Sequence, residues 1–156
     1  MLMKIAIGSD HAGFELKQKI AARLKEQGHD VTDEGTVGSA SVDYPDYARK
    51  VANDVADGRT AFGVLVCGSG IGMAIAANKV PGVRAAQIGR VEEAQLSREH
   101  NNLNVLAIGA RMTPEDDAYK IVDTFLKTSF AGGRHAQRVE KIAQIEKEER
   151  TQTARK

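Results

Sequence analysis

Residues 61–72 read AFGVLVCGSGIG, an uncharged apolar run that passes directly into a loop with three glycines. A parallel strand that is buried on both faces has such a continuous apolar sequence. Glycine allows a tight turn after the strand, and a helix of small residues is expected to follow through about Asn78. The segment therefore predicts one strand–loop–helix unit of an α/β protein.

Strands and helices alternate in the same way on both sides of this segment. Apolar runs bounded by glycine or polar residues predict strands, whereas apolar residues spaced three and four apart predict helices. We expect a three-layer α/β/α sandwich around a five-stranded parallel sheet, Rossmann- or flavodoxin-like in the order 2-1-3-4-5, plus one C-terminal helix. The expected strands are 2–7, 29–35, 61–66, 83–88 and 105–108, and the expected helices are 12–27, 45–57, 71–78, 92–101, 118–126 and 134–150.

The composition restricts the possible functions. The chain has 156 residues, of which 42% are hydrophobic, so one globular domain over residues 1–150 is expected. Its 22 Lys and Arg nearly balance its 21 Asp and Glu, which argues against a nucleic acid or an anionic membrane as partner. A single cysteine excludes an intramolecular disulfide and a multi-cysteine zinc site, and it suits a reducing compartment. Since the N-terminal sequence also lacks the features of a signal peptide, we expect a cytoplasmic protein.

The last expected helix follows the alternating units and carries its own apolar stripe of Val139, Ile142 and Ile145. The stripe can pack on its own domain or across an interface in a homodimer, and the interface is favoured because a five-stranded sandwich is already covered without this helix. The polar residues 151–156 are expected to form a disordered tail.

Two polar loops are expected to meet at the carboxyl ends of strands one and three, residues 9–13 and 67–72. In open α/β sheets, ligands bind where the strand order reverses, which is at this point. The glycine loop does not fit a dinucleotide motif, because Met73 stands where G-x-G-x-x-G needs glycine, and no Walker A sequence occurs. The backbone N–H groups of residues 70–73 can instead surround an oxyanion, unless the glycines serve only tight packing.

Cys67 and His100 are the candidate groups for proton transfer. A lone cysteine is usually a buried structural thiol, but one just before a helix can act as a thiolate base or nucleophile. Ser69 can cap that helix or relay a proton. His100 ends the helix 92–101, where it interacts with the helix dipole or acts as a general acid or base at the carboxyl-end rim of strand four or five. The four histidines show no metal-ligand spacing, so no metal is expected.

Three arginines are candidates for binding an anion. Arg134 and Arg138 are four residues apart and share one helix face, and Arg111 follows strand five. Each alone would be an ordinary surface arginine. Three guanidinium groups near one rim, with His11 nearby, predict a phosphate clamp.

Several segments resemble the RpiB/LacAB family of sugar-phosphate isomerases, and they span about residues 3–150. The resemblance implies an aldose–ketose isomerase of carbohydrate metabolism, acting in the pentose phosphate pathway. Such an enzyme interconverts D-ribose 5-phosphate and D-ribulose 5-phosphate through a cis-enediolate and uses no cofactor. It also implies dimers or tetramers whose sites draw on two subunits. The segments are Gly8–Gly13, Asp43–Pro45, Cys67–Gly72, Ala76–Lys79, Ser97–Asn101, Asn104–Ala107 and Gly132–Arg138.

Residue roles also follow from the resemblance. Cys67 matches the base that moves a proton between C2 and C1, His100 the residue that opens the furanose ring, and Ser69 a hydroxyl of the anion hole. Because Met73 stands where another branch has a glutamate base, the sequence resembles the cysteine branch. The matching substrate-binding positions are Asp10, His11, Tyr44, Gly68, Ser69, Gly70, Ile71, Gly72 and Asn101, and the phosphate-binding positions are His11, Arg111, Arg134 and Arg138.

Three alternatives remain open from the sequence. The substrate can be another aldose phosphate, such as galactose 6-phosphate, allose 6-phosphate or a tetrose phosphate. The protein can also be a non-catalytic nucleotide-binding module or a redox sensor that uses Cys67. Neither of these last two functions needs His100 or the arginine pair.

Overall fold

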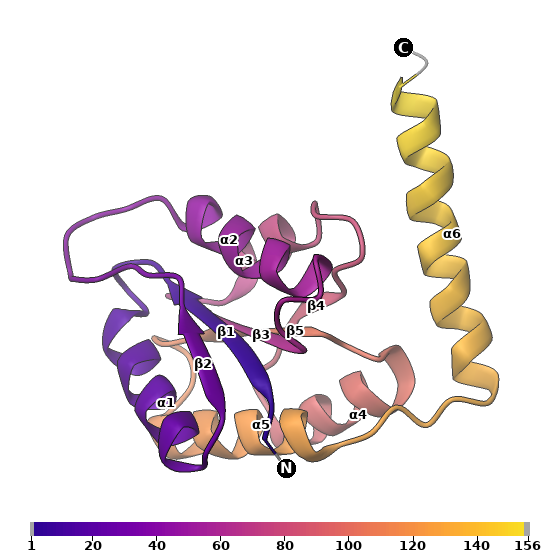
Figure 1. Cartoon of the computed structure of the whole chain (residues 1–156). Coiled ribbons are helices and arrows are strands. Elements are labelled where there is room, and N and C mark those ends of the chain that lie inside the picture. Colours follow the sequence, from indigo (N-terminus) through magenta and orange to yellow (C-terminus); the bar gives the residue numbers. More distant parts are fainter. Residues whose placement is uncertain (1, 155–156) are drawn as a thin grey trace.

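A parallel sheet of five strands runs through the centre of the computed structural model, which describes residues 2–154 (Figure 1). The strand order is β2-β1-β3-β5-β4. The expected α/β class is confirmed. The strands are β1 (Lys4–Ser9), β2 (Asp30–Asp33), β3 (Phe62–Cys67), β4 (Ala85–Gln87) and β5 (Val105–Gly109). The helices are α1 (Phe14–Glu26), α2 (Tyr44–Ala56), α3 (Ile71–Ala77), α4 (Val91–Asn101), α5 (Glu115–Lys127) and α6 (Arg134–Ala154).

The predicted order of the last two strands is wrong, because β5 and not β4 pairs with β3. All five residues of β5 are buried, whereas β4 has three residues, of which two are half-buried and one is exposed. A central parallel strand needs apolar side chains on both faces, but an edge strand does not. The unbroken apolar run of β5 therefore occupies the interior of the sheet and leaves β4 at the edge.

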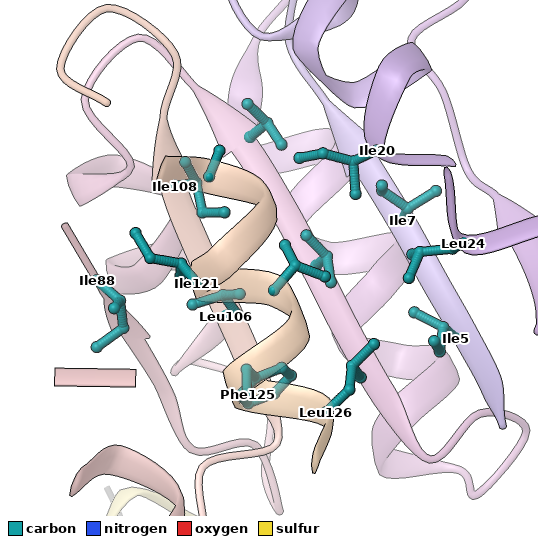
Figure 2. Packing of buried hydrophobic residues seen from close by; sticks show 14 of the residues in the cluster. Ile5, Ile7, Ile20, Leu24, Ile88, Leu106, Ile108, Ile121, Phe125 and Leu126 are labelled. Carbon is teal, nitrogen blue, oxygen red and sulfur yellow. The ribbon is translucent and has the colours of Figure 1, made fainter. Parts of the chain in front are cut away.

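Helices cover both faces of the sheet. α2 and α3 pack on one face, and α1, α4 and α5 pack on the other. Figure 2 shows the second face, where Ile7 of β1, Ile20 of α1 and Ile121 of α5 belong to one buried cluster. Four helices connect consecutive strands. α2 and α3 lead the chain towards the β4 edge and share one face, whereas α1 and α4 lead it in the opposite direction and share the other face. Crossovers of a single hand require this division.

Each crossover helix returns the chain from the carboxyl ends of the strands to their amino ends, which we call the carboxyl edge and the amino edge of the sheet. α4 therefore begins at the carboxyl edge, after β4, and ends at the amino edge, before β5. The guanidinium carbon of Arg98, in the last turn of α4, lies 4.9 Å from the ring centroid of Phe62. Phe62 is the first residue of β3 and Cys67 is the last, so the end of α4 and Cys67 lie at opposite edges.

α6 extends away from the sandwich (Figure 1). Ile142 and Ile145 expose 48% and 61% of their surface, so the apolar stripe of α6 is not buried against its own sandwich. Gly82, in the connection between α3 and β4, donates its backbone N–H to the carboxylate of Glu146 of α6 at 3.2 Å.

The C-terminal end of α6 differs from the expectation. The helix continues to Ala154, whereas a disordered tail was expected from Thr151. Arg155 and Lys156, the end of that expected tail, lie outside the described residues. No helix within residues 2–154 is long and apolar enough to cross a membrane.

Candidate active site

The carboxyl edge brings together the loops that follow β1, β3 and β5. Ser9 pairs with Val66 in the sheet, and Cys67 pairs with Gly109. Asp10 donates its backbone N–H to the carbonyl of Val66 at 3.2 Å, and its Oδ1 accepts the N–H of Gly13 at 3.0 Å. The expected meeting of residues 9–13 with residues 67–72 is thus confirmed.

Cys67 lies at the end of β3 with 5% of its surface exposed. The backbone N–H of Gly70 donates a hydrogen bond to its Sγ at 3.1 Å. Gly70 has a φ of 80°, and a Cβ at this position would come within 3.0 Å of the backbone of Ile108, so glycine is required here. The Gly70 N–H thus points at the sulfur and holds it at the end of the strand.

Two of the four backbone N–H groups that were expected to surround an oxyanion, those of residues 70–73, already have hydrogen-bond partners. The hydroxyl oxygen of Ser69 accepts the N–H of Ile71 at 3.2 Å, and Gly70 already serves the sulfur. The N–H groups of Gly72 and Met73 have no hydrogen-bond partner within residues 2–154. Two of the four expected donors therefore remain available, and the hydroxyl proton of Ser69 is also available to donate.

His11 and Tyr44 lie at the same edge. Nδ1 of His11 accepts the backbone N–H of Val42 at 3.2 Å, so in a neutral imidazole the ring proton is on Nε2. The ring of Tyr44 lies against Gly72, where a Cβ would come within 2.5 Å of its Cε1 atom. His11 therefore presents an N–H donor, and Tyr44 covers one side of the glycine loop.

Arg111 supplies the cation of this edge. Its backbone N–H donates to the carbonyl of Gly68 at 3.0 Å, and a Cβ at Gly68 would lie 3.1 Å from Nη1 of Arg111. The guanidinium thus lies over the glycine loop, and the residue is exposed.

A second cluster lies at the amino edge, at the end of α4 and the beginning of α6. The rings of His100 and His135 stack with centroids 4.2 Å apart and an interplanar angle of 11°. The pKa of His135 is lowered, first because the ring is partly desolvated and then because His100, Arg134 and Arg138 lie near it. A pair of stacked imidazoles beside two guanidinium groups is an arrangement that can bind an anion and exchange a proton.

The predicted position of His100 at the carboxyl edge is therefore wrong, and so is the predicted grouping of Arg134 and Arg138 with Arg111. A crossover helix that begins at the carboxyl edge must end at the amino edge. Five residue steps along β3, about 16 Å at roughly 3.3 Å per residue, separate Cys67 from the level at which α4 ends.

The candidate residues thus form two groups within one chain. We call one the cysteine half-site and the other the histidine half-site. The cysteine half-site consists of Asp10, His11, Tyr44, Cys67, Gly68, Ser69, Gly70, Ile71, Gly72 and Arg111, and the histidine half-site consists of His100, Asn101, Arg134, His135 and Arg138.

His135 is a residue of this group for which the sequence predicts no role. Its place beside Arg134, which follows two glycines and begins α6, is the signal in the sequence that points to it. No three His, Cys, Asp or Glu side chains of residues 2–154 gather closely enough to hold a metal ion.

Comparison with known proteins adds the family. Residues 5–142 match the family model described as Ribose/Galactose Isomerase. The chain is 50% identical over 145 residues to ribose-5-phosphate isomerase B of Escherichia coli K12, which covers 93% of this chain and 97% of that protein. It is 44% identical over 150 residues to the probable ribose-5-phosphate isomerase B of Mycoplasma genitalium, with 95% and 99% covered.

Solved structures agree with this. Ribose-5-phosphate isomerase B of Clostridium thermocellum has a TM-score of 0.92 and 55% identity, with 94% of this chain and 99% of that one covered. The Mycoplasma genitalium enzyme, crystallised with bound ribulose-5-phosphate, has a TM-score of 0.90 and 44% identity, with 93% and 97% covered.

Proposed function

Because this chain belongs to the Ribose/Galactose Isomerase family, we propose that it interconverts D-ribose 5-phosphate and D-ribulose 5-phosphate. The observation that carries the proposal is the position of Cys67. The only cysteine of the chain ends the central strand β3, accepts an N–H from Gly70, and directly precedes the loop and helix start where two N–H groups have no partner within residues 2–154. Sulfur at such a point can act as a base beside a developing oxyanion.

The proposed isomerisation moves two protons. The thiolate of Cys67 takes the proton from C2 of the open aldose, the electrons of that bond form the C1–C2 double bond, and the carbonyl oxygen becomes an oxyanion. The N–H groups of Gly72 and Met73 stabilise this oxygen, each contributing about 2.7–4 kcal/mol in comparable sites. The thiol then protonates C1, while the hydroxyl of Ser69 relays the proton of O2 to O1.

The histidine half-site performs the preceding steps in this proposal. His100 takes the proton of the anomeric hydroxyl and delivers it to the ring oxygen as the C1–O4 bond breaks, which yields the open aldehyde. Arg134 and Arg138 hold the phosphate, whose dianion also relieves their mutual repulsion. Neither sequence of steps changes an oxidation state of the protein, so we propose that no metal or redox cofactor takes part.

One chain alone does not complete this site, since its two half-sites lie at opposite edges of the sheet. We therefore propose a homodimer, or a dimer of dimers, in which the cysteine half-site of one subunit faces the histidine half-site of its partner. The exposed Ile142 and Ile145 of α6 support this assembly, because burying them against a second copy removes apolar surface from water. A cytoplasmic location is proposed as well, since the lone thiol must remain reduced to act as a base.

A turnover panel tests the substrate. Ribose 5-phosphate, allose 6-phosphate, galactose 6-phosphate and erythrose 4-phosphate are compared at equal concentration, without added cofactor and again with EDTA. We expect kcat/KM to be roughly tenfold or more higher for ribose 5-phosphate, the effect of about one carbon in a closed pocket. A preference for a six- or four-carbon sugar phosphate would mean that this sugar, and not ribose 5-phosphate, is the substrate. Loss of activity with EDTA would reject the metal-free mechanism. No turnover on any sugar would favour the nucleotide-binding or redox-sensing alternative.

A mixing experiment tests the shared site. Cys67→Ala and His100→Asn subunits are each expected to be inactive alone. After unfolding and refolding together, about one quarter of wild-type activity is expected, because about half of randomly paired C2 dimers are heterodimers and each of these keeps one intact site. If the mixture remained inactive although heterodimers were isolated, the two half-sites would not act across subunits.

A further inference from the structure

We propose that Arg98 is a positioning residue for the histidine half-site, fixing the end of α4 and the start of α6 relative to each other. This inference rests on the proposed function of His100. Arg98 lies two residues before His100 and is 7% exposed, so it does not itself face a substrate.

The guanidinium of Arg98 joins three segments at the amino edge. Its Nε donates to the carbonyl of Thr128, the first residue after α5, at 3.1 Å. Its Nη1 donates to Oδ1 of Asn102 at 3.0 Å and to the carbonyl of Leu103. Its plane lies over the ring of Phe62 at the start of β3. The side chain is thus held by the strand below it and holds the ends of two helices.

The contact with Thr128 lies at the start of the segment that leads to α6. Residues 128–133 connect α5 to α6, and Ala131 donates its N–H to the carbonyl of Glu99 at 3.1 Å. The connecting segment is therefore tied to the last turn of α4 at two points. His135 lies in the first turn of α6 and stacks on His100, so both ties lie within a few residues of that stack.

Stability alone does not explain a buried arginine here. No carboxylate of residues 2–154 forms an ion pair with Arg98, and burial and the neighbouring Arg84 lower its pKa. A cation that is desolvated without a counter-ion costs free energy. What it contributes is a rigid fork of donors to three oxygens in fixed positions, which a lysine ammonium does not reproduce.

Arg98→Lys tests the inference, with Arg23→Lys as the matched control. Arg23 also bridges two helices and lies over an aromatic ring, but its partners are Asp123 and Tyr119, away from the histidine half-site. In wild-type protein, the stacked rings of His100 and His135 are expected to shift each other's proton resonances upfield. We expect Arg98→Lys to abolish this shift and Arg23→Lys to keep it.

Kinetics supply the second readout. A misplacement of about 1 Å can cost about 10²-fold in rate, so we expect kcat/KM on ribose 5-phosphate to fall by that order in Arg98→Lys and to stay near wild-type in Arg23→Lys. If Arg98→Lys does not fold, Asn102→Gly removes one partner of the fork, and its φ of 49° suits glycine. This variant is expected to show a smaller change in the same direction.

An unchanged histidine stack in Arg98→Lys or Asn102→Gly would overturn the inference. It would also be overturned if the Arg98 and Arg23 variants lost activity equally and in proportion to the decrease in their melting temperatures. The resonance shift does not depend on turnover. If the wild-type protein isomerised no sugar phosphate, the proposed function would be wrong. The resonance shift would still show whether Arg98 holds the two rings together.

Discussion

The backbone N–H of Gly70 donates to Sγ of Cys67 over 3.1 Å, so the loop that follows β3 folds back on the sulfur that ends the strand. A loop of this shape needs glycine at residue 70, where φ is positive and the backbone of Ile108 leaves no room for a side chain. The sulfur is therefore held in place by the backbone rather than by another side chain, and its removal leaves the loop's other contacts in place.

The first prediction concerns this sulfur. Cys67→Ala is expected to abolish isomerisation while ribose 5-phosphate still binds, because the base is lost and the arginines are not. A loss of at least about 10²–10⁴-fold in kcat is expected for a single base. Calorimetric binding and turnover are measured together, with Cys67→Ser as a near-isosteric control of weaker basicity. Full activity in the alanine variant would reject Cys67 as the base.

The second prediction separates ring opening from proton transfer. Ribulose 5-phosphate stays open, since its O5 carries the phosphate and cannot close a ring on C2. In D₂O, His100→Asn is therefore expected to exchange the C1 proton of ribulose 5-phosphate within a few-fold of wild-type, while its turnover of ribose 5-phosphate falls by about 10²–10⁴-fold.

Proton NMR measures the exchange and a coupled assay measures the turnover. His29→Asn is the matched control, because His29 also lies at the amino edge and its ring accepts, among residues 2–154, only the backbone N–H of Met3. Equal losses of exchange and turnover in His100→Asn would assign His100 to the enediolate step instead.

The sequence predicts the five strands and six helices found within residues 2–154, because most have an apolar period and each has a glycine or polar boundary. The signal is weak for β2, whose four residues include one apolar side chain. The order of β4 and β5 is missed, although the fully apolar run of β5 already indicates a central strand and the mixed residues of β4 an edge strand. Whether a strand is buried on both faces can be predicted from its own sequence, so the positions of β4 and β5 in the sheet can be predicted without knowing the rest of the fold.

The site is predicted only in part, for two different reasons. The loops after β1 and β3 meet as expected, since neighbouring parallel strands end at the same edge. The placement of His100 fails because the direction of α4 carries its last residue to the opposite edge, which the connectivity alone implies. The hydrogen bond from Val42 to His11 and the stack on His135 cannot be predicted, because each depends on the path of an irregular segment.

The third prediction concerns the phosphate clamp. Arg138→Ala is expected to raise KM for ribose 5-phosphate by roughly tenfold or more, the loss of one charge-assisted hydrogen bond, and to leave kcat nearly unchanged. The pKa of His135 is lowered by desolvation, by His100, by Arg134 and, least of these four, by Arg138. Arg138→Ala removes the last of these causes, so the pKa of His135 is expected to rise.

Kinetics and an NMR titration of His135 check both effects, with Arg150→Ala as a control farther along α6. A changed kcat with an unchanged KM would place Arg138 in the chemical step rather than in binding.

The last prediction concerns a pair of carboxyl groups away from both half-sites. Asp54 of α2 is buried, and its Oδ1 accepts a hydrogen bond from Nε of Arg59 at 2.9 Å, whereas its Oδ2 has no partner within residues 2–154. Glu34 follows β2 and lies against this carboxylate. Its pKa is raised, first because a protonated Glu34 can donate a hydrogen bond to Asp54 and then because of partial burial.

A raised pKa in the folded state means that folded protein binds more protons than unfolded protein between the two pKa values of Glu34. The free energy of unfolding of wild-type protein therefore decreases as pH rises from about 4.3, the ordinary value for Glu, through the higher folded value.

Glu34→Gln removes this dependence, since its amide donates to Asp54 at every pH. We expect the variant to be more stable than wild type at pH 8 by about 1 kcal/mol, the net worth of one hydrogen bond, and the difference to vanish below about pH 4. Urea unfolding at both pH values measures the effect, with Glu26→Gln at an exposed position of α1 as the control. A Glu34→Gln protein that is less stable than wild type at pH 8 would show that the two carboxyl groups do not share a proton.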